Sequence, residues 1–66
     1  MNDHMIEVSY PSEVQTIHFS DELDLHQLCN LLKNTGYLRI EGEYRVGVNT
    51  QRGPIVFLAQ HIISIS

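Results

Sequence analysis

The chain has 66 residues, of which 42% are hydrophobic and 18% are charged, and its formal net charge at pH 7 is −4. This composition is too apolar for a disordered tail, its acidic balance argues against a general nucleic-acid binder, and no apolar run is long enough to cross a membrane. The length predicts one small domain over residues 1–66, with a loose N-terminus at residues 1–4.

Two amphipathic strands are predicted at the start of the chain. Apolar residues alternate with polar ones through residues 6–10 and again through residues 14–19, where Ile17 and Phe19 share a face. The segment 11–13 between them begins with proline, which is typical of a turn. The pattern therefore predicts an N-terminal β-hairpin.

A helix is predicted near residues 21–34. Ser20 can cap its first turn, where acidic residues favour the helix dipole, and Gly36 is a natural residue at its end. Apolar side chains spaced for one helical face are Leu25, Leu28, Cys29 and Leu32.

An antiparallel meander is predicted after the helix, with strands at residues 37–41, 44–48 and 54–58. A break at residues 59–61 precedes a further short strand near residues 62–65. The order β-β-α-β-β-β, with this short strand after it, predicts an α+β fold: a small antiparallel sheet or a partly open barrel, with the helix packed on one face.

The register of the meander follows from matching its apolar faces. Ile40 is expected opposite Tyr44, which leaves a three-residue turn at residues 41–43, and a second turn is expected at residues 51–53.

This register places Arg39 opposite Arg45 on the outer face, an unfavourable pair of like charges. Either Glu41 and Glu43 neutralise the two arginines, or the guanidinium groups bind an anion such as a carboxylate, a phosphate or the acidic patch of a partner. The candidate residues for binding a partner or an anion are Arg39, Arg45, Arg52, Tyr37 and Tyr44.

The segment 54–58 is apolar on both faces. Val56 and Leu58 are expected to face the helix, so that Ile55 and Phe57 point to the opposite side. A domain of this length buries only about 60% of the surface of its unfolded chain, which favours a second copy packing there. The predicted oligomer interface consists of Ile55, Phe57 and Ile62.

His26 and Cys29 are three residues apart on the predicted helix and make half of a metal site. No second pair of ligands accompanies them, and Cys29 fits the apolar face of the helix, so neither a metal nor another cofactor is expected. A single cysteine and the lack of a secretory leader indicate a cytoplasmic protein.

The sequence contains no recognisable catalytic set, so we expect no enzymatic activity. It favours a small interaction module, a regulator, adaptor or inhibitor of a larger protein, that self-associates through the segment 54–58. Compact acidic modules of this kind are typical of bacterial or phage accessory proteins.

Two alternatives stay open. The strand pattern resembles small SH3-like and Sm-like barrels, without a shared motif, and this resemblance implies nucleic-acid binding through Arg39, Arg45 and Arg52. The acidic balance weighs against it. The other alternative is a metal-binding protein or enzyme subunit that uses His26 and Cys29.

Overall fold

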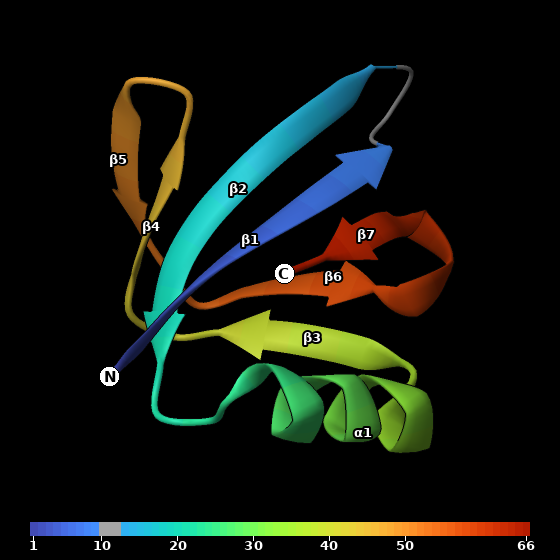
Figure 1. The fold of residues 1–66 in the computed structure, drawn as a ribbon. Helices are drawn as coiled ribbons and strands as arrows, with labels where there is room; N and C mark the ends of the chain where they lie inside the picture. The colour runs from blue at the N-terminus through green and yellow to red at the C-terminus, as the bar shows by residue number, and fades with distance from the viewer. Residues whose placement is uncertain (10–12) are drawn as a thin grey trace.

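The computed structural model describes residues 1–9 and 13–66, which form a small α+β fold with two antiparallel sheets and one helix (Figure 1). The elements in chain order are β1 (Asn2–Ser9), β2 (Val14–Asp21), α1 (Leu25–Thr35), β3 (Tyr37–Ile40), β4 (Glu43–Val46), β5 (Asn49–Arg52), β6 (Ile55–Leu58), the 3₁₀ helix η1 (Ala59–His61) and β7 (Ile62–Ile65). A five-stranded sheet has the order β5-β4-β2-β1-β7, and β3 pairs with β6 in a two-stranded sheet.

The β1–β2 hairpin is the centre of the structure. Ile6 and Val8 of β1 and Ile17 and Phe19 of β2 point to the same face and are buried, because alternate residues of a strand share a face. This face is called the inner face of the five-stranded sheet. The predicted hairpin is confirmed, although the end of its first strand at Tyr10 and most of its turn lie outside the described residues.

The expectation of loose residues at positions 1–4 is wrong, because β1 already begins at Asn2. His4 is only 6% exposed. Its Nε2 lies 2.8 Å from the carbonyl oxygen of Leu23, and its Nδ1 lies 3.3 Å from that of Ser66. This buried imidazole therefore connects β1 both with the segment before α1 and with the end of the chain.

The helix begins four residues later than predicted. Its N-cap is Asp24 instead of Ser20: the Asp24 carboxylate accepts a hydrogen bond from the backbone of Gln27 at 2.8 Å, and the Gln27 side chain accepts one from the backbone of Asp24 at 2.9 Å. This reciprocal pair is a capping box. Gly36 ends the helix in the left-handed region with φ 79°, as predicted.

Only half of the predicted apolar face of α1 is covered. Leu28 is completely buried and Leu32, one turn later, is half-buried against the core, whereas Leu25 and Cys29 are exposed. The helix lies beside β3 (Figure 1), a strand of four residues. Two leucines one turn apart fill this narrow contact.

Residues 37–58 form one long hairpin instead of the predicted meander. β3 pairs with β6, so that Ile40 lies opposite Ile55, and β4 pairs with β5, so that Glu43 lies opposite Arg52. The same register therefore runs through both pairs. The predicted pairing of consecutive strands in a meander is wrong.

The turn of this hairpin lies at Gly47 and Val48. Gly47 has φ 61°, and such a positive value at the first central position is a property of type II′ turns, which match the twist of the flanking strands. Residues 41–43 and 51–53, where turns were predicted, instead face each other in the two arms of the hairpin, at the place where the hairpin bends. Several glycines in this region satisfy local turn rules, so local rules did not identify the real turn.

The bend divides the hairpin between the two sheets. On one side β4 pairs with β2, and on the other β3 brings Leu38 and Ile40 into the core shared with the inner face. At the bend, the backbone N–H of Gly53 donates to the carbonyl oxygen of Gly42 at 2.9 Å. A Cβ atom at position 53 would lie against the carbonyl oxygen of Ile40, so this crossing requires glycine.

We expect Gly53→Ala to lower the free energy of unfolding by about 1–3 kcal/mol, because the backbone at Ile40 must move to admit the methyl group. Gly42→Ala is the matched control, since a Cβ there meets nothing within 4 Å. It is expected to be neutral or to stabilise by up to about 1 kcal/mol. Urea unfolding of both variants measures the difference, and equal effects would contradict this description of the bend.

We expect Leu28→Ala to cost about 2–5 kcal/mol, because it removes a completely buried side chain. A chain of 66 residues is stable by only roughly 3–10 kcal/mol, so this variant is expected to be partly unfolded at 37 °C. Leu31→Ala, on the exposed side of the same helix, is expected to cost less than about 1 kcal/mol. Circular dichroism during thermal and urea unfolding compares the two.

Candidate functional site

An apolar groove of about 430 Å³ lies between β6 and the inner face of the five-stranded sheet. One wall is formed by Ile17 of β2 together with Tyr44 and Val46 of β4, and the other by all four residues of β6. Gln15, Gln51 and His61 complete the lining. No Asp, Glu, Lys or Arg is among these lining residues, so the groove suits an uncharged segment of polypeptide.

The backbone edge of β6 forms its wall of the groove. Successive side chains of a strand point to opposite faces, so four consecutive residues can line one groove only along the strand's edge. On the other edge, Ala59 N–H donates to the carbonyl oxygen of Gly36 at 2.9 Å, beside β3. Because backbone groups alternate in direction, those of Val56 and Leu58 point away from β3, into the groove.

The side chains of β6 have the opposite orientation to the predicted one. Ile55 and Phe57 are half-buried against the core, whereas Val56 is 50% and Leu58 46% exposed. The predicted register placed these faces the wrong way round, because it paired β6 with the segment 44–48, which contains β4, instead of with β3. Tyr37, opposite Leu58, is also exposed and extends the apolar outer surface.

The predicted interface residues therefore have different positions from those expected. Ile62 in β7, like Ile55 and Phe57, packs partly against the core. The exposed apolar surface on this side comes from Val56 and Leu58 instead. The sequence correctly predicted that the segment 54–58 is apolar on both faces, but it wrongly predicted which of its residues point outward.

The predicted facing of Arg39 and Arg45 is wrong, because the two residues belong to different sheets. Arg39 lies opposite Val56 and forms an ion pair with Glu41 at 3.0 Å. Arg52 forms one with Glu43 at 3.2 Å. Both pairs are largely exposed, so each adds little to stability.

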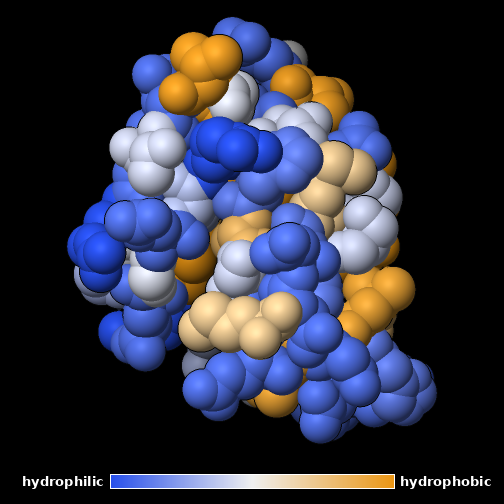
Figure 2. Space-filling model, turned by 60° about the vertical axis from the view of Figure 1, so that its left-hand side comes forward, coloured by the Kyte–Doolittle hydropathy of each residue, from blue (hydrophilic) through white to orange (hydrophobic). Residues whose placement is uncertain are grey.

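The opposite, outer face of the five-stranded sheet is polar. Figure 2 shows the side of the molecule that carries β4 and β5: hydrophilic residues cover most of it, and hydrophobic residues are scattered among them. An open pocket of about 380 Å³ lies here over β1, β2, β4 and β5. The lining residues that point to the outer face are Asp3, His18, Ser20, Glu43, Arg45 and Thr50, and the buried residues His4, Phe19 and Tyr44 complete the lining.

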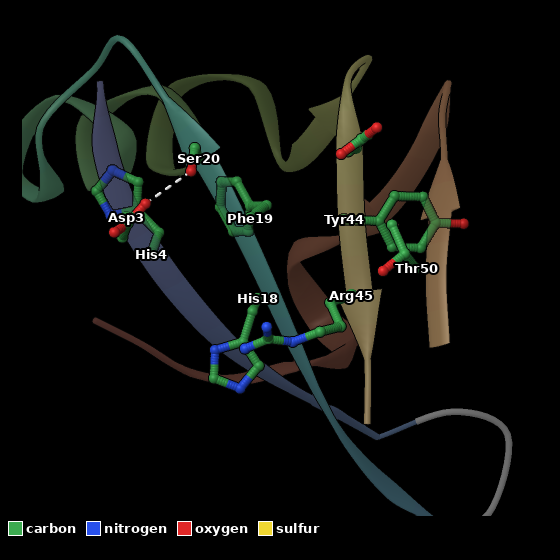
Figure 3. Close-up of a pocket in the computed structure, with 9 residues that line it drawn as sticks. Asp3, His4, His18, Phe19, Ser20, Tyr44, Arg45 and Thr50 are labelled. Atoms are coloured by element: carbon green, nitrogen blue, oxygen red, sulfur yellow. Dashed lines mark hydrogen bonds between the residues drawn. The ribbon is translucent and has the colours of Figure 1, made fainter. Parts of the chain in front are cut away.

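In this pocket Arg45 lies opposite His18 of β2 and opposite Thr50 of β5. The side chains of His18 and Arg45 lie next to each other (Figure 3). Tyr44 also lines this pocket, but it is buried, and its hydroxyl donates to Oε1 of Gln51 at 2.9 Å. Sequence reasoning selected Arg45 but missed both neighbours, because no local pattern indicates that β4 pairs with β2.

His26 and Cys29 are both exposed on α1. Within residues 1–9 and 13–66, no group of three or more His, Cys, Asp or Glu side chains is arranged to hold a metal ion. No helix in the described ranges is long and apolar enough to span a bilayer.

Two surfaces thus have geometry suited to binding: the groove along β6 and the polar pocket around Arg45. Comparisons with protein families, with characterised proteins and with solved structures gave no match.

Proposed function

We propose that the protein is a small, non-enzymatic protein-interaction module that self-associates through β6. The observation that carries this proposal is the unpaired backbone edge of β6 beside an apolar groove. Such an edge can pair with a strand of another chain, which provides main-chain hydrogen bonds, while the side chains of Val56 and Leu58 provide apolar contact. The two sheets then act as a partly open barrel, with the groove as its opening.

A second copy of the chain is the occupant that fits this edge best. Two copies of β6 can pair antiparallel about a twofold axis, because such a contact uses the same edge twice. The strand and the groove lining contain no charged residue, so two molecules of net charge −4 meet there without like charges in contact. Salt strengthens this association, since it screens the repulsion between the two acidic molecules.

The association is weak and depends on concentration. A stable interface buries about 800 Å² on each partner, whereas the exposed apolar residues here are few and only about half exposed. A weak dimer leaves the edge available to an extended segment of a larger protein. A protein that exchanges between a weak dimer and a complex with a larger protein suits the role of a cytoplasmic regulator, adaptor or inhibitor. The exposed thiol of Cys29 suits a reducing compartment.

We expect the wild-type protein to dimerise reversibly in sedimentation equilibrium, and Val56→Pro to remain a monomer. Proline removes the N–H that points into the groove and leaves the hydrogen bonds to β3 intact, because those come from Ile55 and Phe57. Val56→Thr keeps the N–H and the β-branched shape, and is expected to dimerise.

Far-UV circular dichroism checks that each variant is folded. A wild-type protein that stays monomeric at every accessible concentration would rule out self-association. A folded Val56→Pro variant that still dimerises would show that the edge of β6 is not the contact.

A further inference from the structure

Arg45 differs from the other two arginines of the chain. Arg39 and Arg52 each have a glutamate partner, Glu41 and Glu43. No hydrogen bond or ion pair connects the side chain of Arg45 to another described residue. Its guanidinium is therefore available to a ligand.

Two further hydrogen-bonding side chains flank Arg45 on the outer face. His18, Arg45 and Thr50 lie in register on three adjacent strands, β2, β4 and β5, so their backbones are about 4.8 Å apart. All three line the polar pocket, and Figure 3 shows the His18 ring beside the guanidinium. The guanidinium and the imidazole thus lie together, and the hydroxyl of Thr50 lies on the β5 side of the same pocket (Figure 3).

Both carboxylates of the same pocket already accept a hydrogen bond from another side chain. Asp3 accepts a hydrogen bond from the hydroxyl of Ser20 at 2.7 Å, and Glu43 accepts one from Arg52 at 3.2 Å. Neither carboxylate is paired with Arg45: Glu43 is in an ion pair with Arg52, and Asp3 keeps its negative charge on β1, two strands away from β4.

We propose that Arg45, His18 and Thr50 form a binding site for the phosphate group of a phosphomonoester. The planar fork of a guanidinium binds two oxygens of such a group. The imidazole beside the guanidinium can donate to a further oxygen of a tetrahedral anion, and the Thr50 hydroxyl lines the same pocket as a third donor. A carboxylate presents two coplanar oxygens, whereas a phosphate group presents a third oxygen outside the guanidinium plane, where a flanking donor can reach it.

The other charged groups that share the outer face around Arg45 are Asp3 and Glu7 of β1, Glu43 of β4 and Arg52 of β5.

The test is a titration of ¹⁵N-labelled protein with sulfate, followed by NMR. Sulfate is a tetrahedral dianion and therefore resembles the phosphate group in shape and charge. We expect saturable shifts at His18, Arg45 and Thr50, and a loss of about tenfold or more in affinity for Arg45→Gln. Arg39→Gln, an exposed arginine in the other sheet, is the matched control and is expected to bind normally.

Shifts that do not saturate, that sodium chloride reproduces, or that Arg39→Gln and Arg45→Gln reduce equally would overturn the proposal. His18→Gln is expected to keep part of the affinity, because Arg45 still binds the anion. Titrations with inorganic phosphate and with a phosphoserine peptide distinguish the source of the phosphate group. Tighter binding of the peptide indicates a phosphorylated partner, and equal binding indicates a small phosphorylated molecule.

Discussion

The inner face of the β1–β2 hairpin is the surface on which the rest of the structure depends. Its four buried residues are contacted from every side: β4 and β7 pair with its two edges, β3 covers it with Leu38 and Ile40, and α1 adds Leu28. A chain of 66 residues can enclose only one small core of this kind. Covering that core takes most of the chain, and β6 is left with an open edge.

Local sequence patterns predicted the elements well and their long-range pairing poorly. The alternation around Leu38 and Ile40 correctly assigned a strand and its buried face, and Gly36 correctly ended the helix. The pairing of β3 with β6 spans a whole hairpin, so no local pattern encodes it. The choice of the wrong turn, away from Gly47, then inverted both faces of β6.

The two candidate surfaces lie back to back across a single strand. Tyr44 and Arg45 are consecutive residues of β4, so their side chains point to opposite faces of the sheet. Tyr44 lines the groove along β6 and also contributes to the polar pocket, whereas Arg45 lines only the pocket. A change in the position of β4 would therefore alter both surfaces together, which gives a physical route by which a ligand on one face can influence association on the other.

The continuous register of the 37–58 hairpin limits how this protein can change in length. One residue inserted into either arm would turn every side chain between the insertion and the turn to the opposite face, and would misalign the bend at Gly42 and Gly53. Insertions and deletions in the arms must therefore occur in matched pairs. The turn is the exception: Val48 is 95% exposed, so the tip can lengthen without disturbing either sheet, and it is the natural place for a tag or a grafted loop.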